Sequence, residues 1–518
     1  MLAAGGFLAI MLQRGSMAGL EEVREANAND GRQAARRMLV ASISHPSAAL
    51  HAGADSQLSG PGRLVAVDSE ILLCVDGLNS MTTVRKYDLV ILGATGFTGS
   101  IACEYLCEHY PTLAWLATGR SETKLKKLRT TCSQIPETAV LDVTDAARLD
   151  EVVRSARAVA NFAGTPFLNK ALPVVEACAR HGTHYVDITG ETPLQRASYD
   201  RHHKAAVASG AIILHQCGYD SVPSDLAAFL AVNHMRQAHG SDVTELHSFA
   251  GKSRGGLSGG TLATVIQLAL SGALKKMPGV KESLARGAYA LDPEGATGGP
   301  DRELPLAAGS GFQWPLIGRH RYAGWFMPFV MAGPNTAMVR KSSALLRWKT
   351  PRVSEHMAVP GPLSAILGLA GLLLGFFLLA LPPVRALGFA LRLLPRPGEG
   401  PSRRTRDTGF FHMYCVAEGG GGAPTVVGHV RSGDAGDPGY KATARMCVEA
   451  ALCTVKSRDL CAAGGVLTPA SALGDVYVQR LNASGMQLTA ETLDAASAGA
   501  RPPLARGASY RPSEMKAI

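Results

Sequence analysis

Short apolar runs alternate with amphipathic segments between Tyr87 and Ser224. The apolar runs predict buried strands, and the segments between them have the spacing of helices. The predicted strands are residues 87–92, 113–118, 139–143, 158–164, 185–188 and 211–215. This alternation is typical of a doubly wound parallel sheet with helices on both faces. The sequence therefore predicts an α/β fold for this part of the chain.

The pattern changes beyond this region. Residues 242–340 mix short strands with glycine-rich loops, which predicts a second, α+β domain. Residues 464–469 predict a loop before a helix, and the Ala/Pro/Gly/Ser-rich residues 489–518 predict a disordered tail. Residues 1–80 show little organisation and predict an N-terminal extension that is disordered or serves targeting.

One long segment, residues 357–384, contains no charged side chain. As a helix, such a run is long enough to cross a hydrocarbon core of about 30 Å. Both flanks are basic, from Arg340 to Arg352 and from Arg385 to Arg406, which favours both ends on the cytosolic face of a membrane. We expect a membrane-embedded hairpin or a lipid-surface anchor. A spanning helix and a buried core or dimer helix remain as alternatives.

A glycine-rich turn joins the first predicted strand to a helix. Its sequence is Gly93-Ala94-Thr95-Gly96-Phe97-Thr98-Gly99. Gly93 allows a positive φ, Gly96 lets the backbone approach a pyrophosphate, and Gly99 lets the helix pack closely on the strand. The helix N-terminus adds unpaired N–H groups and a partial positive charge. A simple turn is the alternative, but the strand and helix on either side favour a dinucleotide site that also includes Thr95 and Phe97.

The end of the second predicted strand indicates which dinucleotide binds. NAD enzymes place an acid there to hold the ribose 2′-hydroxyl, whereas this chain has Gly119-Arg120-Ser121. Arg120 and Ser121 can bind a 2′-phosphate, so we predict NADPH; a solvated surface charge is the alternative role of Arg120. Further contacts are expected at the next strand ends. They are Asp142 near the adenine, and Asn161 and Gly164 near the nicotinamide half.

The net charge of +10 over 518 residues raises the question of nucleic-acid binding. The Lys and Arg residues are scattered, with no zinc-finger spacing, basic helix–turn–helix or aromatic platform. We therefore expect no nucleic-acid partner and favour a membrane surface. The ten cysteines include no C-x-x-C pair, which predicts a reducing compartment and no metal site.

Polar side chains near the ends of the later strands are the candidates for catalysis. Tyr219 can donate a proton to a carbonyl or enolate oxygen, or else pack as an ordinary buried tyrosine. Asp187 and Glu191, in the Asp-Ile-Thr-Gly-Glu turn, can orient the nicotinamide or its ribose, or cap the next helix. His215 is expected to be a hydrogen-bonded core residue.

Several stretches, in the same order, resemble the saccharopine dehydrogenase-like oxidoreductases, the group that includes the trans-acting enoyl reductases. The resemblance covers residue 88 to about residue 488, and its segments are residues 93–99, 119–121, 185–191, 217–225, 259–264, 397–401, 436–440 and 464–469. It implies a Rossmann domain, an inserted α+β domain, a C-terminal segment that returns to both, and association with membranes or lipid droplets. It does not fix the reaction.

The substrate class can be narrowed from the charges of the expected pocket. Saccharopine reductases need arginines for a substrate with several carboxylates, whereas the loops here carry Asp187, Glu191, Asp220 and Asp225. An acid-rich pocket beside an apolar segment favours an uncharged lipid substrate. Arg196, Lys252 or Arg254 could still enter the pocket from elsewhere in the chain.

These observations divide the chain and give an expected function. The expected parts are residues 1–80 as extension, 81–225 as NAD(P)-binding Rossmann domain, 226–350 as α+β substrate domain, 357–384 as lipid-associated segment, 397–488 as returning segment and 489–518 as tail. We expect an NADPH-dependent oxidoreductase at a membrane or lipid droplet, acting on a lipid-linked enoyl or keto intermediate of glycolipid or other lipid metabolism. The alternatives are a non-catalytic NADPH-binding scaffold or sensor and, third, saccharopine-type lysine metabolism. A homodimer is also left open.

Overall fold

The structure is a computed structural model of the chain. It describes residues 85–164, 167–256, 258–266, 286–293, 315–349, 351–396 and 398–493. The predicted N-terminal extension, residues 1–80, lies outside the described residues, as do residues 494–518 of the predicted tail. Residues 489–493 of that tail are not disordered, because they belong to a strand that ends at Leu493.

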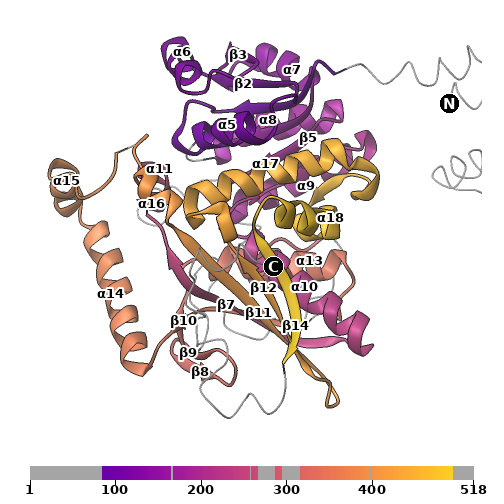
Figure 1. Cartoon of the computed structure of the whole chain (residues 1–518), viewed down its shortest axis with the longest axis vertical. Helices are drawn as coiled ribbons and strands as arrows, with labels where there is room; N and C mark the ends of the chain where they lie inside the picture. Colours follow the sequence, from indigo (N-terminus) through magenta and orange to yellow (C-terminus); the bar gives the residue numbers. More distant parts are fainter. Residues whose placement is uncertain are drawn as a thin grey trace, which may run out of the picture. The chain divides into compact units, whose positions relative to one another are not determined.

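The first sheet has seven parallel strands in the order β3-β2-β1-β4-β5-β6-β13 (Figure 1). They are β1 (Tyr87–Leu92), β2 (Trp115–Gly119), β3 (Glu137–Val140), β4 (Ala156–Asn161), β5 (His184–Asp187), β6 (Ile212–Leu214) and β13 (Gly465–Leu467). The strand order reverses between β1 and β4, and in such sheets the crevice at the carboxyl ends of these two strands is the ligand site. The predicted α/β, Rossmann-type fold is confirmed.

Helices cover both faces of this sheet. They are α5 (Phe97–His109), α6 (Glu122–Thr131), α7 (Ala146–Arg154), α8 (Leu168–His181) and α9 (Thr192–Ser209), with α17 (Thr443–Lys456) added from far along the chain. Leu89 and Ile91 of β1 pack into the core that includes α5 and α17. Val90 and Leu92 point the other way, into the core formed with α7 and α8. A strand buried on both faces needs the continuous apolar run that its sequence shows.

One strand prediction and one loop prediction need correction. The sequence predicts a strand at 139–143, but β3 ends at Val140, because Asp142 turns back to bind the backbone N–H of Thr144. It also predicts a loop at 464–469, whereas residues 465–467 form β13 beside β6. A three-residue strand between glycines and a proline carries almost no periodic signal, and its partner is far away in sequence.

The second sheet is mixed and lies below the first in Figure 1. Its order is β14-β12-β11-β7-β10-β9-β8, with β7 and β10 parallel and the other pairs antiparallel. The strands are β7 (Val243–Arg254), β8 (Gly318–His320), β9 (Gly324–Pro328), β10 (Arg352–Val359), β11 (Phe410–Gly419), β12 (Thr425–Arg431) and β14 (Gln487–Leu493). The C-terminal segment thus gives strands to both sheets.

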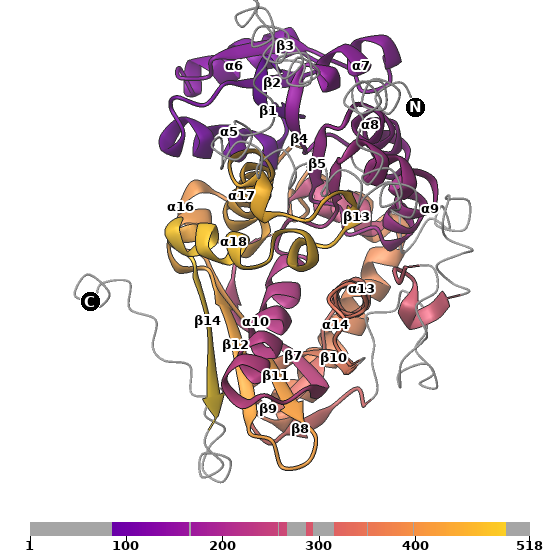
Figure 2. The ribbon, with the colours of Figure 1, turned by 90° about the vertical axis from the view of Figure 1, so that its right-hand side faces the viewer.

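Further helices lie between and beside the sheets. They are α10 (Val222–His239), α11 (Gly259–Val265), α13 (Ala332–Leu345), α14 (Pro362–Ala380), α15 (Pro382–Ala390), α16 (Arg403–Asp407) and α18 (Pro469–Ala483), with the short turns η4 (Gly287–Tyr289), η6 (Gly433–Ala435), η7 (Pro438–Ala442) and η8 (Arg458–Leu460). One face of the second sheet packs on α10, and α13 packs on α10 and β10 (Figure 2).

Helix α14 contains most of the uncharged segment and is largely exposed (Figure 1). It contacts β9 and β10, and Ala365 is its one buried residue. Among the described residues it is the one helix long and apolar enough to cross a membrane. Residues 357–359 of the predicted segment belong to β10 instead, and α15 begins after Leu381. The alternative of a helix buried in the core of this chain is therefore wrong.

Candidate functional site

The glycine-rich turn forms a cradle with no room for side chains. Gly93 has a φ of 77°, and a Cβ there would lie 2.7 Å from the backbone nitrogen of Ala163. A Cβ on Gly99 would overlap the carbonyl oxygen of Gly93. Gly96 occupies the N-cap position of α5, where no side chain caps the helix and the first turn has no acidic residue. These features fit the pyrophosphate of a dinucleotide.

The two other predicted residues of this turn point in different directions. Thr95 lies against β2, since a Cβ on Gly119 would be 2.9 Å from its Oγ1. The Phe97 ring meets the Tyr440 ring edge-on, with 5.1 Å between centroids, and the Arg406 guanidinium lies 5.6 Å above it. Phe97 therefore ties the turn to the C-terminal segment, a role that the sequence does not reveal.

Arg120 lies at the carboxyl end of β2 and is exposed. Within the described ranges it makes no ion pair. Ser121 is the N-cap of α6, and its Oγ accepts the backbone N–H of Lys124 at 3.4 Å. Asp142 is exposed at the end of β3, where hydrogen bonds from Thr144 and the nearby Arg120 lower its pKa. The site thus offers a free cation and a hydroxyl proton, which fits a 2′-phosphate.

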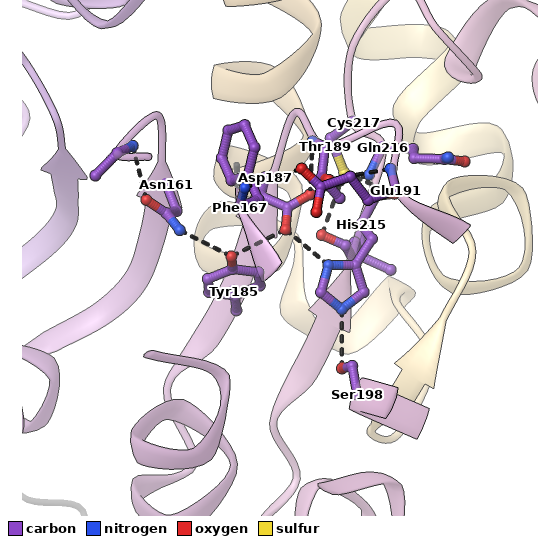
Figure 3. A network of polar contacts seen from close by, with 12 residues as sticks. Asn161, Phe167, Tyr185, Asp187, Thr189, Glu191, Ser198, His215, Gln216 and Cys217 are labelled. Carbon is purple, nitrogen blue, oxygen red and sulfur yellow. Dashed lines mark hydrogen bonds and ion pairs between the residues drawn. The ribbon is translucent and has the colours of Figure 1, made fainter. Parts of the chain in front are cut away.

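A buried hydrogen-bond network joins the ends of β4, β5 and β6 (Figure 3). Asp187 is fully buried and accepts four hydrogen bonds, and the donor–acceptor distances are 2.9 Å from Tyr185 Oη, 2.7 Å from His215 Nδ1, 3.1 Å from Thr189 N and 3.2 Å from Gln216 N. The other ring nitrogen of His215, Nε2, lies 2.8 Å from Ser198 Oγ, so both nitrogens of the imidazole have hydrogen-bond partners. The structure thus places His215 in the hydrogen-bonded core, as expected. Asp187 positions two strand ends, and its carboxylate oxygens are engaged by these protein donors.

Asn161 extends this network toward the cofactor crevice. Its Nδ2 donates to Tyr185 Oη at 3.0 Å, and its Oδ1 accepts the Ala163 N–H at 2.8 Å. It therefore shapes the turn after β4, which leads to Gly164 with a φ of 108°. Ala163 is also the residue that a Cβ on Gly93 would strike. Asn161 thus fixes the position of Ala163, which packs against Gly93 in the glycine-rich turn.

Glu191 occupies the N-cap position of α9, but its side chain does not cap that helix. Its Oε1 accepts the backbone N–H of Phe167 at 2.9 Å, and its own N–H donates to Thr189 Oγ1 at 3.1 Å. The predicted capping role is wrong. Glu191 instead ties the turn after β5 to the start of α8.

Tyr219 and Asp220 are half-buried and lie beyond the end of β6. The Tyr219 ring meets the Phe411 ring edge-on at 4.9 Å, and its backbone N–H donates to Thr443 Oγ1 at 3.0 Å. Burial and the carboxyl groups of Glu355 and Asp220 raise the pKa of Tyr219, so the phenol keeps its proton at neutral pH. Burial raises the pKa of Asp220 to about 6.

The structure adds buried polar residues that the sequence does not single out. Gln216 has a φ of 58°, unusual for a residue other than glycine, and within the described ranges its Nε2 has no hydrogen-bond partner. Ser221 Oγ lies 2.7 Å from Gln216 Oε1 and 2.8 Å from Asn335 Oδ1, and can donate to either. A buried amide donor just past the end of β6, without a partner in the described part of the chain, suits a ligand oxygen.

Glu355 completes this group from β10. Its Oε1 accepts from Ser224 Oγ at 2.7 Å and from Asn335 Nδ2 at 3.1 Å, and burial raises its pKa to about 8. Glu355 and Asn335 lie more than a hundred residues from Ser221 and Ser224 in sequence, so spacing cannot connect them. One signal in the sequence could have pointed to Glu355. It lies two residues after Val353 and two before Met357 on β10, so it shares their face of the strand.

The three basic residues that the sequence left open for a carboxylate-rich substrate are Arg196, Lys252 and Arg254. Arg196 is fully buried and pairs with Asp200 and with the Asp292 carbonyl, which its Nη1 contacts at 2.9 Å. Lys252 and Arg254 are exposed at the end of β7.

Asp225 binds Ser342 and the backbone N–H of Ala470, and burial raises its pKa to about 7. Asp225 thus joins α10 to α18 and α13.

Comparison with known proteins assigns this arrangement. Residues 89–214 match the saccharopine dehydrogenase NADP binding domain. The chain is 35% identical over 422 residues to a candidate trans-acting enoyl reductase of Mycobacterium tuberculosis, covering 78% of this chain and 98% of that one. The chain belongs to the saccharopine dehydrogenase-like oxidoreductases.

A second sequence relative agrees with this assignment. A trans-acting enoyl reductase of Mycobacterium ulcerans is 32% identical over 437 residues, covering 79% of this chain and 99% of that one. Saccharopine dehydrogenase (L-Glu forming) of Saccharomyces cerevisiae is 16% identical with a TM-score of 0.44, covering 79% of this chain and 100% of that one. The protein is an oxidoreductase with NADP as its cofactor. Gly93, Gly96, Gly99 and Arg120 are the residues whose geometry fits that cofactor.

Proposed function

We propose that this oxidoreductase reduces a lipid-linked enoyl or keto group at the cytosolic face of a membrane or lipid droplet, in glycolipid or other lipid metabolism. The observation that carries the proposal is α14, an uncharged helix with most of its apolar side chains exposed, which packs on β9 and β10 of the second sheet. The relatives named trans-acting enoyl reductases support the reaction class. A second copy of the chain on α14 is the alternative partner.

The chemistry divides between the cofactor and the protein. The reduced nicotinamide supplies the hydride when bound. Tyr219, whose pKa is raised, keeps its proton and donates it to the carbonyl or enolate oxygen of the substrate. The free Nε2 of Gln216 donates a hydrogen bond to the cofactor carboxamide or to the substrate carbonyl. Asp187 and His215 act as positioning residues, since they hold the backbone on which Gln216 and Thr189 sit.

The test measures NADPH consumption with an enoyl lipid and with a keto lipid held in phosphatidylcholine vesicles. Consumption is expected for one of the two lipids, and Tyr219→Phe should lower kcat by about a hundredfold, the usual contribution of a positioned acid. The NADPH affinity of this variant should not change. Buried Tyr477→Phe is the matched control for loss of a phenol. Absence of consumption with vesicle-borne lipids, despite NADPH binding, would contradict the proposal.

A further inference from the structure

A row of methionines crosses the second sheet from β11 to β9. Met413 of β11 is the register partner of Ala250 of β7, Ala250 is the partner of Met357 of β10, and Met357 is the partner of Met327 of β9. Directly opposed residues point to the same face of a sheet, so these four side chains form one line. The line crosses three gaps between strands, about 4.8 Å each, or roughly 14 Å. We call Met413, Ala250, Met357 and Met327 the methionine row.

One end of the methionine row reaches the candidate reaction centre. Met331 belongs to the same cluster as Ala250, Met357 and Met413. A Cβ on Gly190 would lie 3.4 Å from Met331 Cε and 3.5 Å from Asp220 Oδ2, so Met331 touches the turn after β5 and lies close to Asp220. Phe411, which contacts the Tyr219 ring, is two residues before Met413 on the same strand. Apolar surface thus continues up to the proposed proton donor.

The other end of the methionine row reaches α14. A Cβ on Gly368 would overlap Met327 Sδ, so the thioether lies directly on the helix backbone. Beyond this contact α14 exposes a large apolar surface, formed by Leu363, Ile366, Leu367, Leu373, Leu374, Phe377 and Leu378. The methionine row therefore lies between the apolar surface of α14, which Met327 contacts, and Met331.

We propose that the methionine row is the binding path for an alkyl chain, which passes from the lipid surface at α14 toward Tyr219 and Asp220. This inference rests on the proposed function, because it names where the lipid part of the substrate lies. Methionine suits the role, since its unbranched thioether side chain adapts to an inserted chain. Met331 and Met357 are only partly buried at the edge of this cluster. Glu355, two residues before Met357 on the same strand face, borders the polar end of the path.

The first experiment maps an alkyl photoprobe on the unaltered protein. A long-chain fatty alcohol with a terminal diazirine is delivered in phosphatidylcholine vesicles to the NADPH-bound full chain, and labelled peptides are identified by mass spectrometry. We expect label on α14 and also on the peptides that contain Met331, Met357 and Met413. In a second arm, serum albumin carries the probe without vesicles. Label confined to α14, or label in the row from the albumin arm alone, would overturn the proposal.

The second experiment blocks the row in the middle. Met357→Trp is expected to lower labelling of the Met331 and Met413 peptides by about tenfold, because an overfilled core resists insertion. Labelling of α14 and the NADPH affinity should stay unchanged, which shows that the variant is folded. Met357→Leu, of similar volume, and exposed Leu460→Trp are the controls. Unchanged labelling of the row in a folded Met357→Trp protein would refute the path.

The outcomes separate this inference from the proposed function. If NADPH is consumed with vesicle-borne lipid but label stays on α14, the path is wrong and the reductase function stands. If label enters the row but no lipid is reduced, the chain path stands and the reductase proposal fails.

Discussion

Single residues set the geometry of the cofactor site. Gly99 faces the carbonyl oxygen of Gly93 so closely that any side chain would force helix α5 away from β1. Arg120 stands exposed at the end of the next strand with no ion pair in the described part of the chain. Both features follow from residue type and position along the chain, and so the sequence could predict them. The buried partners of Asp187, in contrast, lie on β5 and at the end of β6, two strands whose alignment only the fold provides.

Arg120 is expected to decide between NADPH and NADH. A charge-assisted hydrogen bond is worth about 1.5–3 kcal/mol, so Arg120→Ala should weaken NADPH binding by about ten- to a hundredfold while NADH binding hardly changes. Fluorescence titration with both nucleotides gives the two dissociation constants. Arg129→Ala, an exposed arginine on α6, is the matched control and should change neither. Equal losses for NADPH and NADH would rule out the 2′-phosphate contact.

Glu355 is expected to make stability depend on pH in a defined direction. Its pKa is raised from the usual 4.5 to about 8 in the fold, so the folded state binds the proton more tightly than the unfolded state. The contribution of the bound proton on Glu355 to the free energy of unfolding is fully present below pH 4.5 and is lost as the pH rises through about 8. Glu355→Gln removes this titration while keeping an acceptor oxygen. The stability of the unaltered protein relative to this variant should therefore fall between these pH values.

Chemical denaturation of both proteins across this pH range measures the difference. Asp459→Asn, which removes an exposed acid, is the control and should give a difference that hardly varies with pH. A difference for Glu355→Gln that stays constant with pH would show that Glu355 is not protonated in the fold.

Among the elements, α14 has well-defined ends but packs little against the rest of the described chain. Gly361 is its N-cap and Pro362 its first residue, while Arg385 Nη1 contacts the carbonyl oxygens of Leu379 and Ala380 at 2.7 and 3.1 Å. A basic side chain there also favours the negative end of the helix dipole. Its apolar exposed surface would be costly in water over this length, which is why a lipid surface is the proposed environment.

Two charges on the exposed surface of α14 should release the protein from vesicles. Leu367 and Leu374 are 62% and 56% exposed, so lysines at both positions add no burial cost within the fold. Vesicle flotation should show loss of binding, because each lysine opposes insertion by about 2.5 kcal/mol or more. NADPH affinity should not change. Leu460→Lys, at a leucine that is 73% exposed on η8, is the control. Vesicle binding that survives both lysines would place the membrane contact elsewhere.

The elements show where sequence patterns succeed and where they do not. Strands β1, β4 and β5 were predictable because each contains a short run of buried apolar residues, which in β4 is Ala158–Ala160 and in β5 is Tyr185 and Val186. Strand β13 escaped prediction because three residues between breakers carry no period, and β6 supplies its hydrogen bonds from far along the chain. The long uncharged segment is visible in the sequence, but its division between β10, α14 and α15 depends on sheet pairing.

In the whole molecule, the C-terminal part of the chain adds a helix and a strand to the first sheet. Helix α17 covers one face of the first sheet and packs on α5, β4 and β5. Buried Glu449 of α17 accepts hydrogen bonds from Tyr105 Oη at 2.7 Å and from Arg480 Nε at 2.9 Å, and so joins α5, α17 and α18. The part that binds the nucleotide is therefore not continuous in sequence. Spacing alone could not show this.

A fragment of residues 85–240 is expected not to fold stably, although it contains β1 to β6. It lacks β13 and α17, so one face of its sheet would expose the apolar core around Leu89 and Ile91. Circular dichroism and NADPH titration should show a chain without a cooperative transition and without nucleotide binding. The fragment 85–493 is the control and should bind NADPH like the full chain. Full NADPH affinity in the shorter fragment would contradict the role of the C-terminal segment.

The central claim is that the protein transfers a hydride from NADPH to a lipid. The most direct test incubates the full chain with a lipid extract in vesicles and with NADPH deuterated at C4 of the nicotinamide, and then searches the lipids by mass spectrometry. We expect a lipid that gains deuterium with deuterated NADPH and, far less, with deuterated NADH. Tight NADPH binding without deuterium in any lipid would contradict it and would indicate a protein that binds the cofactor without using it.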